Sequence, residues 1–166
     1  LTRVAGSFDI AIGEPLYIVG QVTDAFGVPI DGVIIRIWHT NAAGKYQAIE
    51  DEDSNYIDKN FIGSGQTTTD NMGNYGFLTI FPGYYEDRAP HVNFIIAHPK
   101  FGMIETEMYF ESHPRNEKDP YYLSYDEQEK KFLTATVKNA TTEKKDDSKI
   151  ATFNIVMDGI QSYKGF

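Results

Sequence analysis

The chain has 166 residues, with 24 acidic and 15 basic side chains, a formal net charge of −9 and no cysteine. This length suits one domain with a substantial core, and we expect residues 1–166 to form that single domain. The negative charge disfavours nucleic acid as a partner because it would repel phosphate backbones, and the missing cysteines exclude disulfides, thiolate metal sites and cysteine nucleophiles.

Short apolar runs separated by turn signals recur along the chain and predict strands. Eleven tyrosines and eleven phenylalanines beside one tryptophan favour the same assignment. The expected strands are residues 16–24, 32–40, 75–81, 91–98, 102–110, 132–138 and 151–159. Strands this short and numerous, joined by hairpins, predict an all-β fold: an antiparallel β-sandwich with long loops and little helix.

The segments between these runs are read as turns and loops. Asp70, Asn71, Gly73 and Asn74 make a strong hairpin signal before the third run. The charged stretch 139–149 is expected to be a solvated loop, and residues 125–131 one short helical turn.

No membrane span is expected, since no run approaches the roughly 18 apolar residues that a bilayer requires. No signal peptide is visible, which predicts a cytoplasmic protein. The chain begins at Leu1 and not at methionine, so a leader removed by processing stays open as an alternative.

The stretch "RAPHVNF" carries the main chemical signal. His91 and Asn93 stand two residues apart on an expected strand, so their side chains share one face. Imidazole is a common metal ligand, whereas a neutral carboxamide binds transition metals poorly. His98 falls on the opposite parity and is not expected to supply a second imidazole. On these residues alone, an ordinary strand face is the better interpretation.

Tyrosines recur just outside strand ends, at Tyr46, Tyr84 and Tyr85. A phenolate is a hard anionic ligand suited to ferric iron, and loops on a rigid scaffold often carry functional residues. Taken alone, each tyrosine is a weak metal signal, and a rim residue with a hydrogen-bonded hydroxyl is the simpler interpretation.

Four blocks in order resemble the intradiol ring-cleavage dioxygenases, most closely the protocatechuate 3,4-dioxygenase branch. They are "GEPLYIVGQVTDAFGVPIDGVIIRIWHTNAAGKYQ", "TTTDNMGNYGFLTIFPGYY", "RAPHVNFIIAH" and "TEMYFES", within residues 13–120. The element "IW-x-x-(N/D)-A-x-G-x-Y" joined to "D-x-x-G-x-Y-x-F-x-T-I-x-P-G" is the specific part of this similarity. The resemblance implies the family's β-sandwich and a mononuclear non-haem ferric iron held by two tyrosinates and two histidines.

The resemblance also implies an activity and its partners. A catechol-type diol, protocatechuate-like in this branch, would bind the iron and react with dioxygen, and its ring would open between the two hydroxyl-bearing carbons. No reduced cofactor is implied. Family members usually associate, so a homo- or hetero-oligomer is expected.

Site residues are implied one by one. Tyr46 matches the first tyrosinate, and Tyr85 the second, because that tyrosine follows a Pro-Gly-x element. His91 matches the first histidine of "P-A-H-x-H". Arg88 matches an arginine beside the substrate, and Glu107 stands where the family usually has a glutamine near the ring.

Two departures leave the activity open. The second histidine is Asn93, which can ligate weakly, hold a water or only hydrogen-bond. Glu107 places a negative charge beside an anionic substrate, which is unfavourable unless it is protonated or paired with Arg88.

These departures leave two hypotheses. One hypothesis is an enzyme whose iron is held by Tyr46, Tyr85 and His91 with Asn93 or water. The alternative is a metal-free homologue that serves as an α-type structural or regulatory subunit, or binds aromatics. For a substrate carboxylate, Arg3, Arg36 and Lys45 are candidates, none in a recognisable position.

Overall fold

The computed structural model describes residues 1–2, 10–46, 58, 60–140 and 148–158. In these ranges the strands are β1 (Pro15–Asp24), β2 (Ile34–Trp38), β3 (Ser64–Thr68), β4 (Asn74–Ile80), β5 (His91–His98), β6 (Gly102–Phe110), β7 (Thr134–Asn139), β8 (Lys149–Thr152) and β9 (Ile155–Met157). The helices are the 3-10 helix η2 (Pro114–Lys118), α1 (Pro120–Ser124) and α2 (Glu127–Leu133). The all-β prediction with little helix is confirmed, and β5 and β6 have the bounds expected from the sequence.

The strands follow one hydrogen-bonded path, β3-β2-β5-β6-β7-β8-β1-β4, and β9 pairs with β1. The pairing is mixed, which corrects the antiparallel expectation: β6–β7, β1–β8 and β1–β9 are parallel. The β6–β7 pair has a clear cause. Residues 111–133, which contain the three helices, return the chain to the same end of the sheet, as a parallel pair requires.

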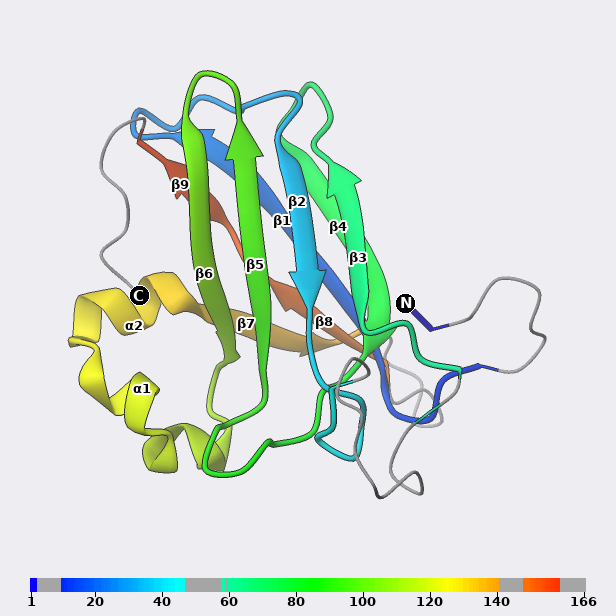
Figure 1. Cartoon of the computed structure of the whole chain (residues 1–166). Coiled ribbons are helices and arrows are strands. Elements are labelled where there is room, and N and C mark those ends of the chain that lie inside the picture. The colour runs from blue at the N-terminus through cyan, green and yellow to red at the C-terminus, as the bar shows by residue number, and fades with distance from the viewer. Residues whose placement is uncertain (3–9, 47–57, 59, 141–147, 159–166) are drawn as a thin grey trace.

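Two layers of strands face each other across the core (Figure 1). One layer contains β2, β3, β5 and β6, and the other contains β1, β4, β7, β8 and β9. On β5, the alternate residues Val92, Phe94 and Ile96 are fully buried. The ring of Phe94 meets Tyr75 of β4 and Phe153, with ring centroids 6.4 and 5.1 Å apart. Each such side chain stabilises the fold by about 1.5–3 kcal/mol through burial. The other parity of β5 points away from this core.

The predicted hairpin before β4 is wrong in its pairing, although the turn itself forms. The Asp70 carboxylate accepts hydrogen bonds from the amides of Met72 and Asn74, both at 2.9 Å. However, β3 pairs with β2, whereas β4 pairs with β1. The turn therefore carries the chain from one layer to the other. The sequence did not predict β3, because its residues are polar and largely exposed and show no apolar alternation.

The helical turn expected at 125–131 corresponds to α2, which begins with a capping box between Asp126 and Glu129. The helices η2 and α1, each five residues long, were not predicted from the sequence. Most of the charged stretch expected to be a loop lies outside the described residues. Among the described residues, no helix has the length and hydropathy needed to cross a membrane.

Candidate active site

The outer face of β5 and β6 carries the predicted polar residues. His91 pairs in register with Tyr109, and Asn93 with Glu107. All four share the face that points away from the core, so strand parity brings them together as predicted for His91 and Asn93. Tyr109 was not among the predicted residues; its alternation with Glu107 on β6 was the signal that could have found it.

The His91 imidazole is buried and held at one nitrogen. Its Nδ1 lies 2.7 Å from the Ala89 carbonyl oxygen, which can only accept, so Nδ1 carries the proton. Burial lowers the pKa of His91, which favours the neutral ring. The Nε2 lone pair is then available, and it lies 3.4 Å from the Tyr46 hydroxyl oxygen. A histidine fixed in this way by a backbone carbonyl is typical of metal ligands.

Asn93 presents its amide nitrogen to Tyr46. Its Nδ2 donates to the Trp38 carbonyl at 3.2 Å and to the Tyr46 hydroxyl oxygen at 3.3 Å. Because the Trp38 carbonyl oxygen can only accept a hydrogen bond, the nitrogen end of the Asn93 amide must face Trp38 and Tyr46. Burial raises the pKa of Tyr46, and the Asn93 donor opposes that rise. Asn93 therefore acts here as a hydrogen-bond donor to the phenol oxygen.

Tyr85 lies against Tyr46, and Tyr84 does not. The Tyr46 and Tyr85 rings meet edge to face with centroids 5.4 Å apart. Tyr84 is exposed and lies under the Arg115 guanidinium, 3.5 Å from the ring centroid. Glu86, with a φ of 53°, makes the turn that brings the Arg88 amide 2.8 Å from the Tyr85 carbonyl oxygen. Such a conformation is costly for a residue with a Cβ, so packing must enforce it.

Two glycines let the tyrosine-bearing loops touch through their backbones. A Cβ at Gly44 would lie 1.9 Å from the Tyr84 carbonyl oxygen, and one at Gly83 would lie 2.5 Å from the Gly44 nitrogen. The Gly83 amide donates to the Asn41 carbonyl at 2.9 Å. This close approach, which requires glycine at both positions, brings Tyr46 and Tyr85 together.

Arg88 is surrounded by acceptors from the protein. Its Nη2 lies 2.7 Å from Glu107 Oε2 and 3.0 Å from the Tyr109 hydroxyl oxygen. Its Nε donates to Asp119 Oδ2 at 3.0 Å, and its guanidinium carbon lies 4.3 Å from the centre of the Tyr121 ring. Burial opposes the charge on Arg88, but Glu107 and the other neighbours more than offset it and raise the pKa of Arg88.

Asp119 is fully buried and links α1 to this cluster. Besides Arg88, it accepts hydrogen bonds from the Ala89 amide at 2.8 Å and from the amides of Tyr121 and Tyr122 at 2.9 and 3.1 Å. Asp119 was not among the residues predicted from the sequence. The pair Asp119-Pro120 was the available signal, because an aspartate followed by proline is typical of a helix start.

The remaining histidines have structural roles. His39 is buried and bonded at both nitrogens, to Thr40 and Thr79. His113 caps η2, and His98 accepts the Lys100 amide at the far end of β5, roughly 23 Å along the strand from His91. The expectation that His98 does not join His91 is confirmed by this separation.

A family model described as dioxygenase matches residues 2–159. The chain belongs to the intradiol ring-cleavage dioxygenase family. A protocatechuate 3,4-dioxygenase beta chain from Burkholderia cepacia is 33% identical over 151 residues, which cover 86% of this chain and 64% of that protein. A catechol 1,2-dioxygenase from Candida albicans is 28% identical over 129 residues, which cover 67% of this chain and 41% of that protein. This chain thus spans less than two thirds of the length of either relative.

Solved structures show the same fold. The dioxygenase domain of a carbohydrate-binding fusion protein from Streptomyces sp. SirexAA-E superposes with a TM-score of 0.70 at 26% identity, covering 93% of this chain and 84% of that one. An intradiol ring-cleavage dioxygenase from Tetranychus urticae gives 0.73 at 20% identity over 93% and 85% of the two chains, which supports the fold alone.

The donor atoms of this intradiol dioxygenase-family chain suit ferric iron in part. Among the described residues, no group of three or more His, Cys, Asp or Glu side chains could hold a metal ion. The candidate donors are the phenol oxygens of Tyr46 and Tyr85 and Nε2 of His91. Phenolate oxygen and imidazole both suit iron. Two atoms bound to one metal at about 2 Å lie roughly 3 Å apart, so the 3.4 Å between Tyr46 Oη and His91 Nε2 is compatible with a shared ion.

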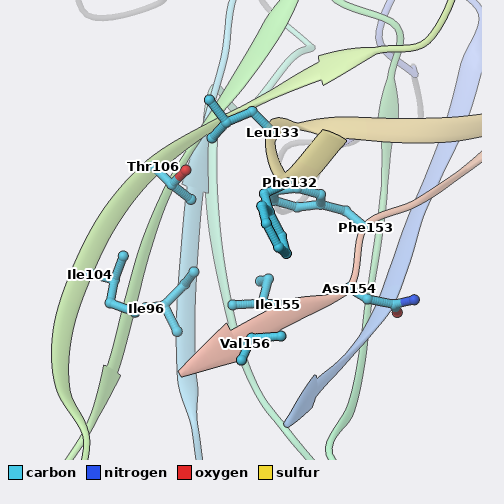
Figure 2. A pocket seen from close by; sticks show the side chains of 9 residues that line it. All are labelled: Ile96, Ile104, Thr106, Phe132, Leu133, Phe153, Asn154, Ile155 and Val156. Carbon is cyan, nitrogen blue, oxygen red and sulfur yellow. The ribbon is translucent and has the colours of Figure 1, made fainter. Parts of the chain in front are cut away.

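A separate pocket lies between the layers near α2 and β9, with room of ≈ 20 Å³, enough for about one water. Figure 2 shows the rings of Phe132 and Phe153 at its centre. Its lining residues carry no acid, base or histidine: Ile96, Ile104, Thr106, Phe132, Leu133, Phe153, Asn154, Ile155 and Val156. The groups capable of chemistry are therefore gathered on the outer face of β5 and β6 and not here.

Proposed function

We propose that this chain is a non-haem ferric iron dioxygenase that opens the ring of a catechol-type diol with dioxygen. The observation that carries the proposal is the approach of the Tyr46 hydroxyl to Nε2 of His91, whose other nitrogen is held by Ala89. An ordinary strand face would not need a buried, oriented imidazole with one nitrogen facing a phenol. The family membership of the chain supports the same conclusion.

Tyr46, Tyr85 and His91 would hold the iron. When bound, iron supplies Lewis-acid activation and alignment of the diol. Asn93, the fourth candidate ligand, would act through Tyr46: its N–H group stabilises the phenolate form of that oxygen by hydrogen bonding. Binding by the remaining protein donors would then be weaker than with a second imidazole.

Arg88 and Glu107 would lie beside the substrate. Arg88 Nη2 lies 2.7 Å from Glu107 Oε2. The guanidinium charge therefore offsets the carboxylate charge and reduces the repulsion expected between Glu107 and an anionic diol. Arg88 would stabilise negative charge in the bound diol, and Glu107 would orient Arg88. The relative from Burkholderia cepacia is a beta chain, so we also propose that this chain associates with itself or with a second chain.

The proposal is tested by adding ferric iron to the purified protein and recording its visible spectrum, since phenolate bound to ferric iron is red-brown. Tyr46→Phe should remove most of the colour and weaken ferric iron binding by at least about tenfold. Tyr84→Phe is the matched control and should change neither, because Tyr84 is exposed and faces Arg115. Dioxygen uptake with catechol should be high in the coloured proteins, the wild type and Tyr84→Phe, and low in Tyr46→Phe. A protein that stays colourless with ferric iron contradicts the proposal.

A second candidate is a metal-free homologue that serves as a structural or regulatory subunit or binds aromatic compounds. The orientation of Asn93 favours it, since the amide offers nitrogen and not oxygen toward Tyr46. A colourless protein that binds catechol without taking up dioxygen, or that raises the activity of a catalytic partner chain, would establish this alternative.

A further inference from the structure

Arg88 directs its Nε and Nη2 donors at protein groups. Nη2 lies against Glu107 and Tyr109, Nε bonds to Asp119, and the flat face lies over Tyr121. The side chains of Arg88 and Glu107 are only 14% and 15% exposed, and that of Asp119 is fully buried. Water therefore screens these charges less than it would at the surface.

The charges in this cluster sum to a negative value. One guanidinium faces two carboxylates, so Arg88, Glu107 and Asp119 together carry a net charge of −1. The cluster also acts on Tyr46. Burial has the largest effect on the pKa of that phenol and raises it, and the Asn93 hydrogen bond, which lowers it, comes next. After these, Arg88 lowers and Glu107 raises the same pKa. A ligand beside Tyr46 and His91 would thus experience the Glu107 charge as well.

We propose that Glu107 determines specificity, so that the site selects aromatic 1,2-diols without an acidic substituent over diols that carry a carboxylate. This inference rests on the proposed function, because it concerns the ligand of the same site. A carboxylate on the ring would need a cation whose charge is not already balanced by the protein. The charge of Arg88 is already outweighed by the two carboxylates of Glu107 and Asp119. A third would meet net repulsion, which at separations near 8 Å and partial burial amounts to roughly tenfold or more in affinity.

Of the candidate cations, Arg36 does not supply that partner. Arg36 lies opposite Ile95 and not opposite His91, and its Nη2 donates to Gln66 Oε1 at 3.1 Å on the neighbouring strand. Arg3 lies outside the described residues. Arg88 acts electrostatically on both Tyr46 and His91.

The test measures binding to the iron-loaded protein without dioxygen, using three probes of similar size: catechol, 4-methylcatechol and 3,4-dihydroxybenzoate. The shift of the visible band gives each affinity. The wild type should bind the two uncharged diols similarly and at least about tenfold more tightly than the acid. Glu107→Gln should improve binding of the acid relative to catechol by roughly tenfold, because one carboxylate charge is removed while the side-chain shape is kept.

Glu105→Gln is the matched control. Glu105 lies two residues away on the same face of β6 and is exposed, so the same charge change there should leave the affinity ratio within about twofold. Thermal unfolding shows whether each variant is folded; if Glu107→Gln does not fold, the wild-type preference among the three probes decides.

Each outcome has a definite meaning. Tighter wild-type binding of the acid, or a ratio that Glu107→Gln leaves unchanged, overturns the role of Glu107 even where ring cleavage is observed. Failure of all three diols to bind overturns both the specificity and the proposed function. The expected selectivity with no dioxygen consumption on adding air supports the specificity and contradicts the enzymatic function.

Discussion

Two buried histidines, in different parts of the molecule, are held in different ways. His39, just after β2, has both nitrogens bonded: Nδ1 lies 2.6 Å from the Thr40 carbonyl oxygen and Nε2 2.8 Å from the Thr79 hydroxyl oxygen. His91, at the start of β5, has a short bond at Nδ1 but only a 3.4 Å contact from Nε2 to Tyr46. Burial lowers the pKa of both rings.

The difference distinguishes a structural histidine from a candidate ligand. Every donor and acceptor of His39 is used within the fold, so its ring contributes stability and offers nothing to a ligand. His91 is oriented by one bond while its second nitrogen faces a phenol at a long distance. A buried nitrogen without a short hydrogen bond costs free energy, and a metal or ligand bound to Nε2 of His91 would regain it. The predictions below test this contrast, in order of expected effect.

The largest effect is expected at Asp119, which supports the His91 region through Ala89. Asp119→Ala removes a buried partner of Arg88, the acceptor for the Ala89 amide and the cap of α1. We expect a loss of about 3–5 kcal/mol in the free energy of unfolding, measured with denaturant. NMR signals of the His91 ring should also shift, whereas those of His39 should not.

The matched control for this change is Asp126→Ala. Asp126 also caps a helix, α2, but it is exposed, so its loss should cost only about 1 kcal/mol. If the two variants lose similar stability, Asp119 is only a helix cap and does not support the site.

The next effect is the pH dependence of stability, which we expect His39 to dominate. Burial lowers the pKa of His39 from 6.5 to about 4, with the Thr40 bond opposing. The unfolded chain therefore binds the proton more readily. The contribution of neutral His39 to the free energy of unfolding is complete above pH 6.5. It decreases as the pH falls toward 4, by roughly 3 kcal/mol in all.

Denaturant unfolding at pH 7 and pH 4.5 measures this loss. His39→Gln should reduce the difference between the two pH values, although it also lowers stability at pH 7. His98→Gln, at the end of β5, is the control and should keep the difference. An unchanged pH dependence in the His39 variant would show that the proton is taken up elsewhere.

Much of the outer face of β5 could be predicted from the sequence, because it depends on local periodicity. The alternation of apolar residues in 91–98 predicts both the bounds of the strand and the shared face of His91 and Asn93. The family resemblance then placed Tyr46, Tyr85 and Arg88 near that face, where the structure has them. Tyr85 and Tyr84 are adjacent in sequence, and the Pro-Gly-x rule selected the one that contacts Tyr46.

What could not be predicted depends on contacts between distant segments. The strand β3 forms because the edge of β2 offers hydrogen bonds to a polar segment, and the parallel β6–β7 pair follows from the helical return. Asp119 reaches Arg88 across 31 positions of the sequence. The direction of the Asn93 amide is set by the Trp38 carbonyl, 55 residues away, which no local pattern reveals.

The smallest expected effect concerns Asn93, where the chain departs from two-histidine binding. Asn93→His replaces an amide that donates to Tyr46 with an imidazole on the same face as His91. We expect about tenfold tighter ferric iron binding, or about 1.4 kcal/mol, measured by competition with a chelator. The control is Ile95→His, which places an imidazole two residues farther along the same face, opposite Arg36, and should add little affinity. If the Asn93 variant binds iron no better than the wild type, the missing imidazole is not what limits the site. A second imidazole beside the oriented ring of His91 should improve any site that is built to hold a metal. If it does not, the contrast between His39 and His91 reflects packing alone.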